Sequence, residues 1–165
     1  MPVAAMKRRQ LTLFVPDAWA ASLERVRSVL DPVQHGLIAA HVTLCREDEL
    51  AGVDASSLDE RLPGAGALTL GFGPAQRFAG HGVLRPCIAG PGAFEALRQR
   101  ALGRAELRTA QAHLTLAHPR NPRAPGNVDA RLAESAAPLQ LRFDEVAWIA
   151  QDGDAPWAVL RRWAL

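Results

Sequence analysis

The pentapeptide His-Val-Thr-Leu-Cys at 41–45 recurs as His-Leu-Thr-Leu-Ala at 113–117, 72 positions later in the chain. Each copy carries a histidine two residues before a threonine. In an extended strand alternate side chains point to the same face, so each histidine projects together with its threonine while the residues between them face a core. A tag repeated at this spacing predicts two related units, each contributing one histidine-bearing strand.

The predicted elements around the two tags follow the same order. A helix over 17–30 precedes the first tag strand, 37–45, and a helix over 93–102 precedes the second, 111–117. Residues Leu68, Leu70 and Phe72 match Leu139, Leu141 and Phe143 at an offset of 71. The other expected elements are strands over 10–15, 67–72, 76–89 (with a turn at His81-Gly82), 139–150 and 156–163, helices over 56–62 and 128–136, and a loop over 118–127. We therefore predict a duplicated α+β unit with pseudo-two-fold symmetry.

Composition is that of an ordinary globular domain, with 48% hydrophobic and 22% charged residues. The formal charge of +2 is too small to argue for wrapping of nucleic acid, although a local basic cleft is compatible with it. No apolar run approaches the roughly 20 residues that span a bilayer. Cys45 and Cys87 fit no zinc spacing and are too few for a disulfide framework. We expect a cytoplasmic monomer that does not bind membranes.

Two imidazoles on opposite sides of a bound group suit the chemistry of phosphodiesters. With an ordinary pKa near ~6.5, one histidine can accept a proton while the other donates one. In-line displacement at phosphorus needs such a base on the entering side and such an acid on the leaving side. The threonine hydroxyls can donate hydrogen bonds to the non-bridging oxygens, where negative charge sits in the transition state. This scheme requires no metal and no cofactor.

The paired His-x-Thr-x motifs resemble those of the two-histidine phosphoesterase superfamily, in particular its bacterial 2'-5' RNA ligases and RNA 2',3'-cyclic phosphodiesterases. The resemblance covers nearly the whole chain, including the opening Leu-Phe-Val-Pro. It implies that residues 1–165 form a single bilobal domain, with antiparallel sheets lining a central cleft and helices outside.

The same resemblance implies an enzyme that opens 2',3'-cyclic phosphates on RNA 3' ends or small cyclic nucleotides, with 2'-5' ligation as the reverse reaction. It makes His41 and His113 the acid–base pair, and Thr43 and Thr115 the residues that hold the phosphate. The nearly symmetric tags leave open which histidine is the base and which the acid.

One position departs from the family pattern. Members often carry an arginine five residues after the second motif's histidine, where this chain has His118, while the first motif has Arg46 at the equivalent place. Simple alternation turns both residues away from the histidines unless the strand ends or bulges there. The candidates for substrate binding are Arg46, His118, Arg120, Arg123 and, by stacking on a base, Phe14.

Two other functions fit part of the same sequence pattern. A non-catalytic module that binds RNA ends or nucleotides needs the same cleft, but it does not need both proton-transfer groups. A histidine-based metal hydrolase is disfavoured, because no His, Asp and Glu cluster has ligand spacing. The intact pair of tags favours the metal-independent phosphodiesterase.

Overall fold

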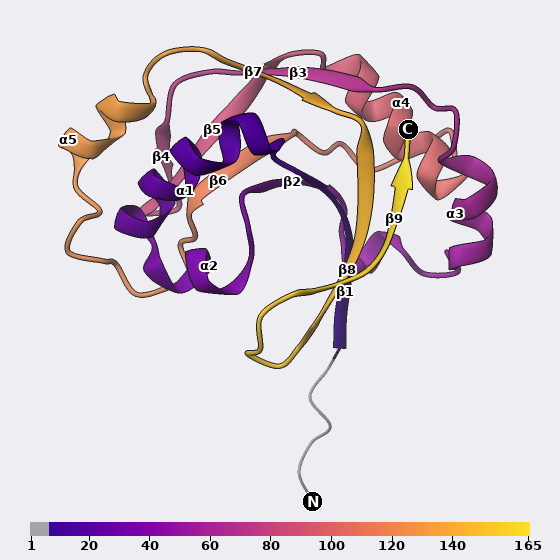
Figure 1. The fold of residues 1–165 in the computed structure, drawn as a ribbon, viewed down its shortest axis with the longest axis horizontal. Coiled ribbons are helices and arrows are strands. Elements are labelled where there is room, and N and C mark those ends of the chain that lie inside the picture. The colour runs from indigo at the N-terminus through magenta and orange to yellow at the C-terminus, as the bar shows by residue number, and fades with distance from the viewer. Residues whose placement is uncertain (1–6) are drawn as a thin grey trace, which may run out of the picture.

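The computed structural model describes residues 7–165 of the chain as a single curled sheet with helices around it (Figure 1). Its strands are β1 (Lys7–Phe14), β2 (His41–Cys45), β3 (Leu68–Phe72), β4 (Gln76–Phe78), β5 (Gly82–Ala89), β6 (His113–Ala117), β7 (Leu139–Phe143), β8 (Glu145–Asp152) and β9 (Ala158–Ala164). The helices are α1 (Asp17–Leu30), α2 (Pro32–Leu37), α3 (Ala55–Arg61), α4 (Pro91–Leu102) and α5 (Asp129–Leu132), with short 3-10 turns at Glu47–Glu49 and Ala133–Ser135.

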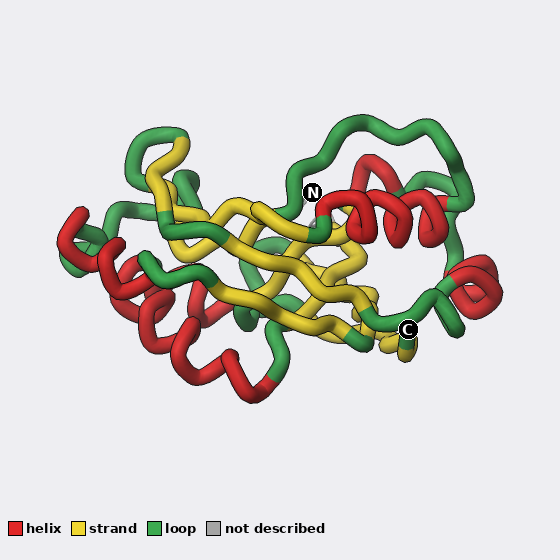
Figure 2. Tube along the Cα trace, turned by 90° about the horizontal axis from the view of Figure 1, so that it is seen from above, coloured by secondary structure: helices red, strands yellow, loops and turns green. Residues whose placement is uncertain are grey.

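The sheet of residues 7–165 runs in the order β7-β3-β5-β6-β2-β1-β8-β9, with β4 paired to β5, and neighbouring strands are antiparallel. Strands β7 and β8 stand far apart in this order, yet Asp144 alone separates them along the chain. The sheet must therefore curl until these strands approach each other. Seen from above, the strands gather in the middle of the molecule and the helices surround them (Figure 2).

One hydrophobic core joins both halves of the chain. It contains Val42 and Leu114, the residues between histidine and threonine in each tag, together with Leu23 of α1 and Phe94 of α4. The face of the central strands opposite the histidines is thus covered by helices. Apolar residues at helical spacing on α1 and α4 pack onto it.

The strand registers repeat between the halves. Strand β1 pairs with β2 as β5 pairs with β6, with every partner displaced by 72 positions and the same irregularity in both ladders. The matching pairs are Thr12–Thr43 with Leu84–Thr115, Leu13–Val42 with Arg85–Leu114, Phe14–His41 with Pro86–His113, and Leu11–Cys45 with Val83–Ala117. Strand β4 pairs with β5 in one half, as β8 pairs with β1 in the other.

Two strand pairs join equivalent positions of the halves. Val42 pairs with Leu114, and Leu70 pairs with Leu141. A two-fold axis relating the halves has to pass between two paired residues that occupy equivalent positions in the halves. The registers are therefore those that a duplicated unit would produce, and duplication itself stays our interpretation.

The structure corrects three of the expected elements. The strand expected over 37–45 begins only at His41, because Asp31 caps a short helix, α2, that starts at Pro32. The strand expected over 139–150 is broken at Asp144, and its two parts pair with different neighbours, β3 and β1. The helix expected over 128–136 is only one α-helical turn followed by a 3-10 turn.

Candidate active site

The two tags form the neighbouring strands β2 and β6 at the centre of the sheet. His41, Thr43, His113 and Thr115 are all partly exposed, while the residues between them are buried. We call the side of the sheet that carries these four residues the histidine face. Sequence alternation predicted this arrangement, and the structure brings all four residues together.

The register fixes how the four side chains lie. Because Val42 pairs with Leu114 in an antiparallel ladder, His41 falls opposite Thr115 and Thr43 falls opposite His113. Opposite Cβ atoms in such a ladder lie about 4.5–5.5 Å apart and diagonal ones about 7–8 Å. The two histidines occupy the diagonal, so a small group can lie between their rings, and each ring has a threonine of the other strand beside it.

The imidazole rings are held in the same way in both tags. Nδ1 of His41 lies 2.8 Å from the carbonyl oxygen of Ala39, and Nδ1 of His113 lies 2.9 Å from that of Gln111. A carbonyl oxygen can only accept, so Nδ1 carries a proton and donates it in both rings. The other ring nitrogen, Nε2, is therefore the atom that each ring can use to take up or release a proton.

His41 lies in an environment that disfavours its charged form. Burial lowers the pKa of His41 to about 4, against a hydrogen bond to Ala39 that raises it. The positive Arg27 and the neighbouring His113 lower the pKa further, whereas the negative Glu24 raises it. The His41 imidazole is therefore neutral at pH 7 and able to accept a proton.

A bulge near the end of each tag strand changes the alternation. Thr43 pairs with Thr12, but the next pair joins Cys45 to Leu11, so that Leu44 and Cys45 are both buried. Regular alternation would place Cys45 on the histidine face, but this bulge turns it into the core.

Each bulge also affects the residue that follows the strand. With Cys45 in the core, alternation returns Arg46 to the histidine side, and the matching bulge in β6 does the same for His118. His118 is half-buried, and this burial is the main cause that lowers its pKa. The positive charge of Arg120 lowers the pKa further, and Arg8 and His113 do so more weakly. The negative charge of Asp31 acts in the opposite direction and raises it. Arg46 is exposed at the start of a 3-10 turn.

The remaining predicted binding residues lie in different surroundings. Phe14 is next to His41 in the ladder, with the two rings edge to face at 6.3 Å between centroids. Arg120 is exposed, and its N–H donates to Nδ1 of His118. The guanidinium of Arg123 donates to the carbonyl oxygen of Asn127, within the same loop. Phe14 is thus beside His41, whereas the Arg123 side chain bonds within its own loop.

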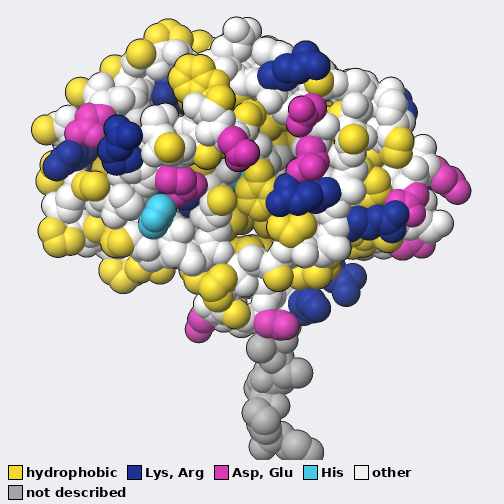
Figure 3. Space-filling model, viewed as in Figure 1, with side chains coloured by type: hydrophobic (Ala, Val, Ile, Leu, Met, Phe, Trp, Pro, Cys, Tyr) yellow, Lys and Arg dark blue, Asp and Glu magenta, His cyan; other side chains and the backbone are white. Residues whose placement is uncertain are grey.

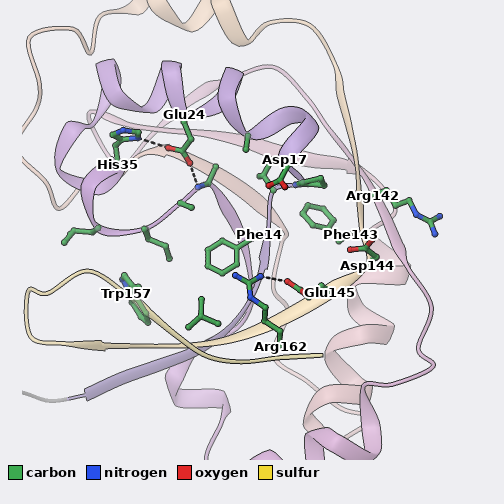
Figure 4. Close-up of a pocket in the computed structure, with 18 of the residues that line it drawn as sticks. Phe14, Asp17, Glu24, His35, Arg142, Phe143, Asp144, Glu145, Trp157 and Arg162 are labelled. Atoms are coloured by element: carbon green, nitrogen blue, oxygen red, sulfur yellow. Dashed lines mark hydrogen bonds and ion pairs between the residues drawn. The ribbon is translucent and has the colours of Figure 1, made fainter. Parts of the chain in front are cut away.

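A cavity of about 890 Å³ lies beside Phe14, the ladder neighbour of His41, and its lining includes none of the four residues of the histidine face. Its walls include Ile38 to Ala40, just before His41, and Trp157 and Arg162 from the chain's last hairpin (Figure 4). Arg162 forms an ion pair with Glu145 and lies over the Phe14 ring at 5.6 Å. The space-filling view shows a hollow here, with apolar side chains inside and charges of both signs around it (Figure 3).

Sequence reasoning missed Glu24, which reaches from α1 to the backbone just before His41 and accepts a hydrogen bond from the N–H of Ala40. One signal was available. A Glu-x-x-Arg pattern at 24–27 recurs at 95–98, in the helix that precedes the second tag, at the offset of 71 already seen in the strands.

Metal sites and membrane-spanning helices are two other features to consider in the described part of the chain. Within residues 7–165, no three His, Cys, Asp or Glu side chains are grouped so that they could hold a metal ion. None of the helices in that same range combines the length and the apolar character that crossing a membrane would take.

Comparison with known proteins supports the family suggested by the tags. No curated protein matches the chain. Among solved structures, E. coli LigT in complex with ATP has 19% sequence identity and a TM-score of 0.61, over 96% of this chain and 97% of that one. A phosphoesterase has 16% identity and a TM-score of 0.60, over 97% and 99%. The protein TT0787 of Thermus thermophilus has 16% identity and a TM-score of 0.52, over 96% and 97%.

At these identities the structural matches establish the fold. The family is established by the model of the 2'-5' RNA ligase superfamily, which matches residues 15–155 and so spans both tags. The chain therefore belongs to the 2'-5' RNA ligase superfamily.

Proposed function

We propose that the protein is a metal-independent phosphodiesterase that opens 2',3'-cyclic phosphates on RNA 3' ends or on small cyclic nucleotides. The observation that carries this proposal is the register of β2 and β6. It puts two histidines on the diagonal of one face, each beside a threonine hydroxyl, with both Nε2 atoms left for proton transfer. A module that only binds nucleotides has no need of two histidines held in the same tautomer.

The reaction follows from this geometry. Nε2 of neutral His41 accepts a proton from a water molecule as the water oxygen attacks phosphorus. The bond between phosphorus and the 3'-oxygen breaks, and protonated His113 donates its Nε2 proton to that oxygen. The products are a 2'-phosphomonoester and a 3'-hydroxyl. The lowered pKa of His41 is the reason for assigning it the role of base.

The threonines stabilise the negative charge on the phosphate oxygens that take no part in bond making or breaking. Hydroxyls of Thr43 and Thr115 donate hydrogen bonds to the non-bridging phosphate oxygens, which carry negative charge throughout the displacement. In the reverse direction the same groups exchange roles, and a 2'-5' linkage is formed. That E. coli LigT has been crystallised with phosphate and with 3'-AMP supports a nucleotide phosphate as the ligand class here.

The test measures formation of 2'-phosphate products from 2',3'-cyclic nucleotides and from RNA with a cyclic end, in the presence of a chelator. We expect activity in the wild type and at least about 10²-fold less in His41→Ala and in His113→Ala. Arg131→Ala is the control, because Arg131 lies on α5 and its exposed side chain pairs with Glu134. An inactive wild type would refute the reaction, and an active His41→Ala or His113→Ala would refute the acid–base assignment.

A further inference from the structure

We propose that Glu24 is a positioning residue for His41 and acts on it through the peptide group that joins Ala39 to Ala40. This inference rests on the proposed function, in which His41 transfers a proton. The N–H of that peptide donates to Oε1 of Glu24, and its carbonyl oxygen accepts from Nδ1 of His41 at 2.8 Å. Figure 4 shows the Glu24 side chain reaching from α1 to this backbone and to His35.

The peptide group carries the effect of the carboxylate to the ring. Hydrogen bonds in series polarise one another, so a negative charge at the N–H end makes the carbonyl oxygen a stronger acceptor. A stronger acceptor favours the Nδ1–H tautomer of His41, which leaves Nε2 free to act as a base. It also stabilises the imidazolium that forms once Nε2 has taken up a proton, in the way a carboxylate in direct contact would.

Glu24 is itself fixed in place. The guanidinium of Arg27, which is 1% exposed, donates from Nη1 to both carboxylate oxygens at 2.8 and 2.7 Å. Arg27 also donates from Nη2 to the carbonyl oxygen of Ile38 at 2.8 Å, one residue before the relaying peptide. From α2, Nδ1 of His35 lies 2.7 Å from Oε2 of Glu24. The charged and titratable groups facing Glu24 are thus Arg27 and His35.

The second tag provides a natural comparison. Glu95 and Arg98 occupy the equivalent positions on α4, and Nη1 of Arg98 lies 2.9 Å from Glu95. Here, however, the hydrogen bonds found within residues 7–165 include none from a backbone N–H to Glu95. The Gln111 carbonyl that accepts from His113 therefore has no carboxylate behind its peptide. The two tags share the ring contact and differ in the carboxylate.

The experiment compares Glu24→Gln with the matched control Glu95→Gln. Glutamine keeps an acceptor for the Ala40 N–H and removes the charge, and each variant removes the carboxylate from the same kind of Glu-x-x-Arg pair. Nitrogen-15 NMR of the imidazole rings reports the tautomer and the pKa of His41 without any substrate. Steady-state kinetics on a 2',3'-cyclic nucleotide then separates kcat from KM.

In Glu24→Gln we expect a larger share of the other His41 tautomer, a lower pKa of His41, and kcat reduced about tenfold with KM within about twofold. Glu95→Gln should leave all of these as in the wild type. An unchanged tautomer and pKa of His41 in Glu24→Gln, or the same changes in Glu95→Gln, would overturn the proposal.

Failure of the proposed function and failure of the positioning role can be told apart. If the wild type has no phosphodiesterase activity, the proposed function fails, while NMR still decides whether Glu24 acts on His41. If Glu24→Gln does not fold, Glu24→Asp decides instead, because its shorter side chain keeps a charged partner for Arg27 but withdraws the carboxylate from Ala40. An unchanged His41 tautomer and pKa in Glu24→Asp would then refute the positioning role.

Discussion

Two histidines in the same local sequence need not behave alike, because the charges around a ring lie outside its motif. Both tags hold Nδ1 on the carbonyl oxygen two residues earlier. Burial, the positive Arg27 and the carboxylate of Glu24 all alter the pKa of His41. Alternation predicted that the four tag residues share one face of the sheet, and the structure places them so, while their catalytic roles stay a prediction. The sequence could not assign acid and base, because these neighbours come from a helix that precedes the tag by 14 residues or more.

The lowered pKa of His41 predicts a dependence of stability on pH. The unfolded chain has an ordinary histidine pKa near ~6.5 and the folded chain one of about 4, so between these values the unfolded state binds more protons. The contribution of His41 to stability is therefore complete above about pH 6.5 and is lost as the pH falls towards 4.

Urea unfolding of the wild type and of His41→Asn at pH 7.5 and 4.5 measures this contribution. Asparagine can still donate to the Ala39 carbonyl oxygen but does not titrate. We expect the wild type to lose more stability than the variant on going to pH 4.5. Equal losses in the two proteins would show that burial does not depress the pKa of His41.

At the scale of elements, the sequence predicted those parts that have a long regular pattern. The helix expected over 17–30 is confirmed as α1, and the helix over 93–102 is confirmed within α4. The six-residue α2 was missed because it is too short to show a helical period. The paired bulges were also missed, since a bulge depends on the partner strand. They shift by one residue the alternation that leads to Arg46 and His118.

One buried side chain ties helix α4 to strand β2 and to the segment that precedes β6. Arg98 is 0% exposed and forms ion pairs with Glu95 and with Glu49, whose side chain is only 10% exposed. Its Nε donates to the carbonyl oxygen of Leu44 in β2, and its Nη1 to that of Arg108, before β6. Replacing it leaves a buried carboxylate and two carbonyl oxygens without their partner.

We therefore expect Arg98→Met to lower the free energy of unfolding by about 3–5 kcal/mol, although methionine preserves most of the apolar stem. The control is Arg131→Met, whose partner Glu134 is also three residues away, with both side chains 48% exposed. An exposed pair of this kind contributes about 0–1 kcal/mol. Urea denaturation of both variants measures the difference. Similar values for the two would show that burial of Arg98 adds nothing.

At the scale of the whole molecule, the sequence suggested two lobes, and the structure qualifies that description. The halves share one hydrophobic core and one sheet, joined where Val42 meets Leu114 and where Leu70 meets Leu141. The offsets of 72 and 71 were visible in the sequence, but which strands pair across the halves was not. The segment expected to form one strand over 139–150 contributes a strand to each half: β7 pairs with β3, and β8 pairs with β1.

A shared core predicts that the halves unfold together. The tryptophans are Trp19, Trp148, Trp157 and Trp163, so fluorescence follows α1 and the β8–β9 hairpin, whereas far-UV circular dichroism follows the whole sheet. Leu70→Ala places a cavity far from this hairpin in the order of strands, at a side chain that is 0% exposed. It should cost about 2–5 kcal/mol. Because unfolding is cooperative, we expect a single transition whose midpoint shifts equally by both probes. If the lobes were independent, the tryptophan transition would stay at its wild-type midpoint while the dichroism curve divided into two steps.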